Sequence, residues 1–146
     1  MERADATPHR THDLEAAVTA LLGRIDGPLK LGAPLGIGKP HRLLNALYAR
    51  MAADPARPLH LYTALSLDPP SGRSALEKRF LGPLVQRLYG DGFPRLAYVA
   101  AQKRDALPAH VEVEEFYLQS GALLGSRQAQ RRYASLNYTH VARALA

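Results

Sequence analysis

The stretch Leu59-His60-Leu61-Tyr62-Thr63-Ala64-Leu65 decides the fold of this chain. Polar and apolar residues partly alternate along it and prolines bound it, which predicts a buried strand. Apolar residues before and after it recur at spacings of three and four, as in helices that bury one face. Strands that alternate with helices indicate an α/β fold with a mostly parallel sheet and helices packed on it, in which ligands bind at loops following strand ends.

Two helices are predicted before this strand. The first starts at Leu14 and can end at Gly23 or Gly27, and the second starts at Pro40 and ends before Pro55. Their apolar faces comprise Leu14, Ala17, Val18, Leu21, Leu22 and Ile25 in the first helix, and Leu43, Leu44, Leu47, Tyr48 and Met51 in the second.

A third helix is predicted after the strand. Ser74 and Glu77 have the spacing of a capping box, in which each side chain satisfies a free backbone N–H group at the helix start. Apolar residues follow at helical spacing as far as Leu88, and Pro83 among them predicts a kink or two shorter helices. The segment from there to Pro108 fits neither helix nor strand clearly, and both remain open.

A second strand is predicted from Val111 to Leu118. Val111, Val113 and Glu115 alternate with their neighbours, so the polar face of this strand points to solvent or to a cleft. The tail from residue 126 to residue 146 predicts two helices separated near Asn137.

Length and composition indicate one domain without a membrane segment. With 146 residues, 47% of them hydrophobic, the chain can bury a core, so we expect a mobile lead-in at residues 1–12 and one domain at 13–146. No stretch approaches the roughly 18 uninterrupted apolar residues of a membrane helix, and the start lacks the apolar core of a signal peptide. We therefore expect a cytoplasmic protein with no membrane partner. The absence of cysteine excludes disulfides, thiolate metal sites and a cysteine nucleophile.

The net charge of +6 could indicate a nucleic-acid partner, so the placement of the basic residues decides. Adjacent basic residues occur only at Lys78-Arg79, Lys103-Arg104 and Arg131-Arg132, and no aromatic residues interleave with a basic stripe. We therefore expect no nucleic-acid partner. Part of the charge is interpreted as attracting a small anion such as a phosphorylated cofactor.

The loop from Gly32 to Pro40 is the strongest local sign of a ligand. Glycines let a backbone approach a ligand closely, and a following helix N-terminus offers free N–H groups to phosphate or carboxylate. The spacing departs from a phosphate-binding P-loop, and a tight strand-to-helix turn without a ligand remains the alternative. The candidate binding residues of this loop are Gly36, Ile37, Gly38, Lys39 and Pro40.

Few other residues indicate catalysis. Glu112, Glu114 and Glu115 form a carboxylate cluster, but alternating glutamates usually form the solvated face of a strand. The six histidines have no metal-ligand spacing, and no Gly-x-Ser-x-Gly elbow is present. We therefore assign no catalytic residue and no metal site.

Five segments together carry a resemblance to a known family. They are Leu35 to Pro40 with the helix through Asn45-Ala46-Leu47-Tyr48, Tyr62 to Leu67, Leu76 to Leu84, Glu115 to Gly121, and Asn137 to His140. In this order they resemble the N-terminal part of the acetyl-CoA hydrolase and CoA-transferase family. The resemblance covers the chain from about Leu29 onward, and it implies a CoA-transferase-like N-terminal domain that is incomplete without a C-terminal half.

The resemblance also implies an acyl-CoA-processing enzyme in which a glutamate attacks a thioester. An acyl-glutamyl anhydride and a glutamyl-CoA thioester then pass the acyl group or CoA to a small carboxylic acid or to water. A coenzyme A thioester would be a substrate, with no permanently bound cofactor. The family's glutamate occurs in a Glu-x-Gly setting in the C-terminal half, and no Glu-x-Gly occurs in this sequence.

By the same resemblance, residues 36–40 line the acyl or carboxylate side of the site, with Thr63 and Ser66 beside it at a strand end. The segment 119–121 and Asn137 are nearby candidates. The sequence departs from the family at both, because phenylalanine and then proline are expected before Gly121, and Leu136 stands where a serine is usual. The expected partners are acyl-CoA, a small carboxylic acid, and a C-terminal half or a second copy. A non-catalytic remnant or anion-binding module with this fold is the alternative.

Overall fold

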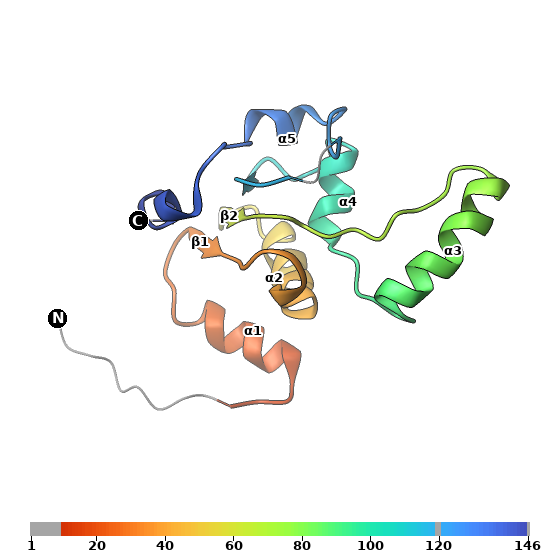
Figure 1. Ribbon diagram of the computed structural model, residues 1–146. Helices are drawn as coiled ribbons and strands as arrows, with labels where there is room; N and C mark the ends of the chain where they lie inside the picture. The colour runs from red at the N-terminus through yellow and green to blue at the C-terminus, as the bar shows by residue number, and fades with distance from the viewer. Residues whose placement is uncertain (1–9, 119–120, 146) are drawn as a thin grey trace.

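Three short parallel strands form the centre of the molecule. The computed structural model describes residues 10–118 and 121–145 (Figure 1). Strands β1 (Leu29–Gly32), β2 (Leu59–Thr63) and β3 (Val111–Glu115) lie side by side in the order β1-β2-β3. The α/β class with a parallel sheet is therefore confirmed. The predicted lead-in at residues 1–12 lies for the most part outside the described residues.

One face of the sheet carries the hydrophobic core. Helices α2 (His41–Ala52) and α4 (Ala97–Lys103) pack on this face, and α1 (Leu14–Leu22) packs on α2. The inward row of each strand is apolar because alternate residues of a strand point to the same side. The core consists of Leu29, Leu44, Met51, Leu59, Leu61, Leu96, Tyr98, Val99, Ala101, Leu107, Val111 and Val113.

The opposite face of the sheet is polar except near its carboxyl edge, where Tyr62 packs against Phe116. His60 of β2 and both Glu112 and Glu114 of β3 point to this side and are only partly buried. His60 Nε2 lies 3.2 Å from Glu114 Oε2, and Arg132 pairs with Glu112. The prediction that β3 has a polar face turned to solvent is confirmed. This face is unusual for a parallel sheet, whose two faces are normally both covered.

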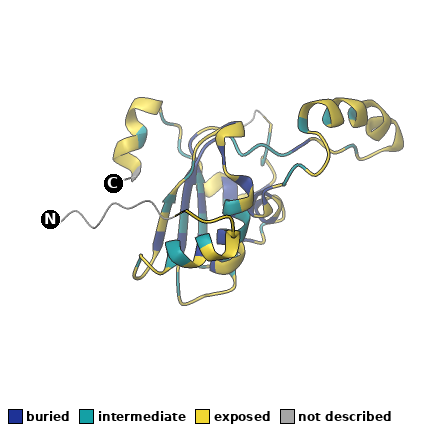
Figure 2. Cartoon of the chain, turned by 90° about the horizontal axis from the view of Figure 1, so that it is seen from below, coloured by how far each residue is buried: buried dark blue, intermediate teal, exposed yellow. Residues whose placement is uncertain are grey.

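Helix α3 (Ala75–Tyr89) stands away from the sheet (Figures 1 and 2). Its first turn is closed by the predicted capping box, in which Ser74 Oγ accepts from the N–H of Glu77 and the Glu77 carboxylate accepts from the N–H of Ser74. The helix continues through Pro83 as one element, so of the two predicted alternatives, a kink or two shorter helices, the second is wrong. None of its residues is buried.

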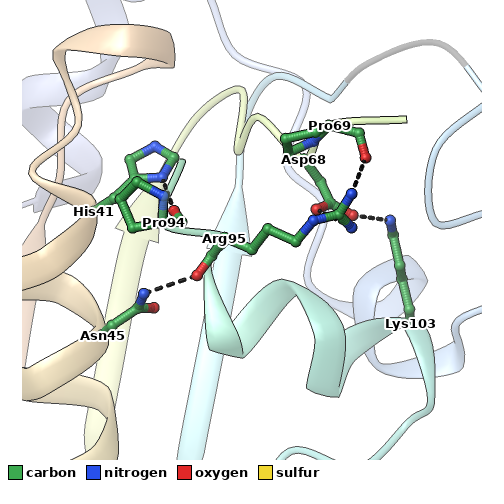
Figure 3. A network of polar contacts seen from close by, with 7 residues as sticks. All are labelled: His41, Asn45, Asp68, Pro69, Pro94, Arg95 and Lys103. Atoms are coloured by element: carbon green, nitrogen blue, oxygen red, sulfur yellow. Dashed lines mark hydrogen bonds and ion pairs between the residues drawn. The ribbon is translucent and has the colours of Figure 1, made fainter. Parts of the chain in front are cut away.

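A network of polar contacts fixes the two ends of the α3 arm to the body (Figure 3). Before the helix, Asp68 pairs with Lys103 of α4 and, at 3.1 Å, with Arg95. Beyond the helix, Arg95 donates to the carbonyl of Pro69 at 2.7 Å, and its own carbonyl accepts from Asn45 of α2 at 2.8 Å. The base of the arm is therefore held by side chains from two core helices.

The structure resolves the segment that the sequence left open and agrees with the prediction for the tail. The segment left open before Pro108 forms α4, whose Tyr98 and Val99 enter the core. The tail contains α5 (Arg127–Arg131), a 3-10 turn (Tyr138–His140) and α6 (Val141–Leu145), which agrees with helices separated near Asn137. Within the described ranges 10–118 and 121–145, no helix has the length and apolar character needed to cross a membrane.

Candidate functional site

Two buried polar residues end the apolar rows of β2 and β3. Thr63 and Glu115 are paired in register and are 1% and 3% exposed. Each lies two residues beyond an inward apolar side chain, Leu61 or Val113, so each points to the face covered by helices. The carboxyl edge of this sheet is therefore polar on its buried side, where parallel α/β sheets bind their ligands.

Lys39 reaches this edge from the loop before α2. Its side chain is buried, and Nζ donates to the Thr63 hydroxyl and, at 3.0 Å, to the carbonyl of Ala64. Burial lowers the pKa of Lys39 from 10.5 to about 8, and the negative charge of Glu115 opposes this change. Lys39 therefore loses its proton at a lower pH than an exposed lysine does.

Ser66 and Tyr98 complete the cluster. The Ser66 N–H and hydroxyl both donate to Glu115 Oε1, the former at 3.0 Å, and Ser66 Oγ lies 2.6 Å from the Tyr98 hydroxyl. Leu65 holds a left-handed backbone with φ of 42°, a conformation that non-glycine residues rarely adopt. This turn brings Ser66 back toward Glu115. We call Lys39, Thr63, Ser66, Tyr98 and Glu115 the strand-end cluster.

The second oxygen of Glu115 is the least satisfied atom of the cluster. Oε2 is buried and has no hydrogen-bond partner among the described residues. Burial raises the pKa of Glu115, and the hydrogen bonds from Ser66 and the charge of Lys39 oppose this rise. A buried polar atom without a partner requires an explanation, such as a water molecule or a ligand. The hydroxyl protons are already used, because Thr63 donates to the carbonyl of Ala33 at 3.2 Å and Ser66 donates to Glu115. The cluster can therefore offer the remaining N–H of the Lys39 ammonium group and a carboxyl group whose burial favours its protonated form.

The backbone N–H groups of the loop before α2 are used differently from the prediction. We expected its backbone N–H groups to face an open cleft. Instead, the N–H of Gly36 donates to the carbonyl of Leu65 at 3.1 Å, and that of Lys39 donates to Gly36 at 3.3 Å. The expectation is wrong for these two groups, because a 3-10 turn (Gly36–Gly38) docks the loop on the end of β2. Ile37, Gly38 and Pro40 are exposed.

An apolar hollow of about 380 Å³ lies at the same edge of the sheet but on its other face. Tyr62 and Phe116 line it, with rings stacked 5.5 Å apart, together with Tyr138 and Val141 of the tail. The Tyr62 hydroxyl is buried without a hydrogen-bond partner among the described residues, and burial raises its pKa. The hollow is within the size range of small-molecule sites.

The predicted site residues are brought together in part. Lys39, Thr63 and Ser66 belong to the strand-end cluster. Asn137 is exposed and caps the turn beside the apolar hollow, where its side chain accepts from the N–H of Thr139 at 3.3 Å. Gly121 is exposed, and the candidates at 119 and 120 lie outside the described residues.

Sequence reasoning missed two members of the cluster as site residues. Glu115 was grouped with Glu112 and Glu114 as a solvated residue, although its position two residues after Val113 places it on the apolar row. This alternate spacing with Val111 and Val113 is visible in the sequence and indicates a buried side chain. Tyr98 gave no comparable signal, because it is one apolar position in a helix of seven residues.

Neither protein-family models, nor curated proteins, nor solved structures give a significant match to this chain. In the part of the chain that the structure describes, no group of three or more His, Cys, Asp or Glu side chains could hold a metal ion. The strand-end cluster and the apolar hollow are the features of this edge of the sheet that could bind a ligand.

Proposed function

We propose that this chain is the N-terminal domain of an acyl-CoA-processing enzyme, an acetyl-CoA hydrolase or CoA-transferase, and forms its acyl or carboxylate pocket. The catalytic glutamate would come from a polypeptide segment outside these residues. One observation carries the proposal: Lys39, Thr63 and Ser66, which the resemblance assigns to that pocket, meet at the carboxyl edge of a parallel sheet beside the buried Glu115.

The chemistry of the cluster suits a carboxylate or a thioester carbonyl. A lysine ammonium group can stabilise negative charge on oxygen, and it does so more strongly in a buried site than in water. Glu115 Oε2, once protonated, could donate a hydrogen bond to a carboxylate. The apolar hollow has room for a short acyl chain, but it lies on the other face of the sheet and would form a separate subsite at the same edge.

A second candidate function is a non-catalytic remnant or anion-binding module with the same fold. Its support is that Lys39 Nζ already donates to two oxygens of β2 and the loop that follows it, and that the loop N–H groups are used internally. In this case the cluster holds the loop against the sheet and needs no acyl ligand.

A binding experiment separates the two. We expect acetate, propionate and butyrate to shift the backbone amide resonances of residues 64–66, and the neutral amide butyramide to leave them unchanged. Lys39→Met should abolish these shifts. Lys30→Met, which changes an exposed lysine of β1, should retain them. If no carboxylate shifts these amides in the wild-type chain and Lys39→Met only lowers the melting temperature, the acyl pocket is excluded and the structural role of the cluster remains.

A further inference from the structure

Helix α3 carries an apolar face that the described residues leave uncovered. Leu76, Phe80, Leu84 and Leu88 are 75%, 77%, 46% and 67% exposed. At 3.6 residues per turn these four positions fall within about 120° of arc on one side of the helix. Exposed apolar side chains are common singly, but a continuous row of four marks an interaction surface.

The arm is built to present this face. An isolated helix of its length with an internal proline has marginal stability in water. Here the capping box closes its start, and the contacts of Asp68 and Arg95 fix both ends to α2 and α4 (Figure 3). The helix therefore stands off the body in a defined position (Figure 2), with no core of its own.

The order of residues along α3 indicates what covers it. The apolar residues of this face are placed symmetrically about position 82. Leu76 and Leu88 lie six residues from it on either side, and Phe80 and Leu84 lie two residues from it. The charges on the same side are mirrored with opposite sign, because Glu77 and Arg87 are each five residues from position 82. A helix with this pattern is complementary to an antiparallel copy of itself.

We propose that α3 is a self-association surface, on which a second copy of this chain packs its own α3 in antiparallel orientation about a twofold axis near position 82. A twofold interface uses the same patch on both copies. Leucines 76 and 88 then face each other across the axis, and Glu77 of each copy lies opposite Arg87 of the other. A parallel pair would instead place Glu77 against Glu77 and Arg87 against Arg87.

The other charged residues of α3 are also compatible with the antiparallel pair. The remaining basic residues of the helix, Lys78 and Arg79, are mirrored by Gln86 and Val85, so the antiparallel pair brings no like charges together. Glu77 keeps its charge, because the backbone N–H groups of Ser74 and Arg73 hold the pKa of this carboxyl below its usual value.

Sedimentation velocity over a concentration series tests the proposal. We expect the wild-type chain to form dimers reversibly. Phe80→Glu should raise the dissociation constant by at least about 100-fold, since it places a charge at the centre of the interface in both copies. Leu124→Glu is the matched control, because Leu124 is 73% exposed but lies outside α3, and it should leave dimerisation unchanged. A wild-type chain that stays monomeric up to ~1 mM overturns the proposal.

A charge exchange tests the orientation. Arg87→Glu alone should weaken the dimer on the order of tenfold, because it creates two like-charged pairs. A mixture of Arg87→Glu chains with Glu77→Arg chains should form heterodimers more tightly than either variant forms homodimers. Glu77→Gln, which can keep the capping box, should weaken the dimer less than Glu77→Arg while leaving helix content unchanged. Dimerisation insensitive to both charges, or no preference for heterodimers, overturns the antiparallel arrangement.

Discussion

Lys39 is a cation that burial disfavours. Its pKa falls from 10.5 in the unfolded chain to about 8 in the folded chain because burial disfavours the ammonium group. Between these pH values the unfolded chain binds a proton that the folded chain has released. The free energy of unfolding therefore rises with pH across this window, and the gain is lost as pH falls through about 8.

We expect the stability of the wild-type chain, measured relative to Lys39→Met, to increase by up to about 3 kcal/mol between about pH 7.5 and pH 10.5. The tyrosines titrate in both chains, so the difference cancels their contribution. Urea unfolding at several pH values measures it. Lys30→Met, an exposed lysine on β1, is the control, and its difference from wild type should stay constant. A constant difference for Lys39→Met as well would show that Lys39 keeps an ordinary pKa.

Glu115 has the opposite linkage. Burial raises its pKa above 4.5, so the folded chain binds a proton that the unfolded chain has lost. Its contribution is present below the unfolded pKa and disappears as pH rises through the folded value. The two buried charges of the cluster thus give opposite slopes, with that of Glu115 beginning near pH 4.5 and that of Lys39 confined to the alkaline range.

Among the elements, α1 and α3 begin with equally clear caps but differ in what they pack against. Asp13 accepts from the N–H groups of Glu15 and Ala16 at 2.9 and 3.2 Å, and α1 buries Val18 completely. Ser74 closes α3, which buries none of its residues. A cap lost from a packed helix weakens the whole domain, whereas a cap lost from the arm weakens the arm alone.

Removing either cap should cost about 1 kcal/mol, but in different measurements. Ser74→Ala should lower hydrogen-exchange protection of the α3 amides about fivefold and leave global urea unfolding unchanged. Asp13→Ala should lower the global free energy of unfolding. Exchange is followed by mass spectrometry at a concentration where the chain is monomeric, so that association does not protect α3. A global loss in Ser74→Ala would contradict an independent arm.

The sequence predicts where helices and strands form better than it predicts what packs against them. Period-two alternation identifies β2 and β3, and the capping box and apolar spacing locate the start of α3. The same spacing also led us to expect a buried face on α3, because periodicity indicates a helix but not what covers it. Helix α4 has seven residues, too few for its apolar positions to establish a period.

The candidate site was predictable in part for the same reason. Glycines and Pro40 mark the loop, and the end of a buried strand marks Thr63 and Ser66, so their proximity follows from the parallel topology. The length and direction of the Lys39 side chain depend on tertiary packing, as does the contact between Ser66 and Tyr98. The docking of Gly36 on Leu65 likewise joins segments that no local pattern connects.

For the whole molecule, apolar surface remains exposed mainly on the α3 arm, and on the sheet it is limited to the apolar hollow at the carboxyl edge. Away from the apolar hollow, the open face of the sheet is polar, with His60 and Glu114 in contact and Arg132 paired with Glu112. Exposed apolar side chains also occur in other segments, Ile37 and Leu124 among them, but those of α3 form a continuous row of four. We therefore expect self-association through the symmetric apolar row of α3. A partner that covered the sheet would instead contact the charged side chains of its open face.

The whole chain should also lack thioester chemistry by itself. Glu115 is buried at the strand end, while Glu112 and Glu114 lie on the opposite face in contact with Arg132 and His60. Glu115 is thus too buried to act as an exposed nucleophile, and the other two carboxylates lie on the wrong face to reach the strand-end cluster. We therefore expect the purified chain neither to release free CoA from acetyl-CoA nor to exchange CoA between carboxylates. A thiol-release assay measures this directly, and the chain contributes no background because it has no cysteine.

The control for this assay uses the same three glutamates. If turnover exceeds that of buffer, Glu115→Gln is compared with Glu112→Gln and Glu114→Gln, which change carboxylates on the other face of the sheet. Loss of turnover in one of these variants alone would show that this chain contains its own nucleophile, contrary to our proposal. Turnover that appears only when a polypeptide with a Glu-x-Gly glutamate is added would agree with a pocket that this chain builds and another segment completes.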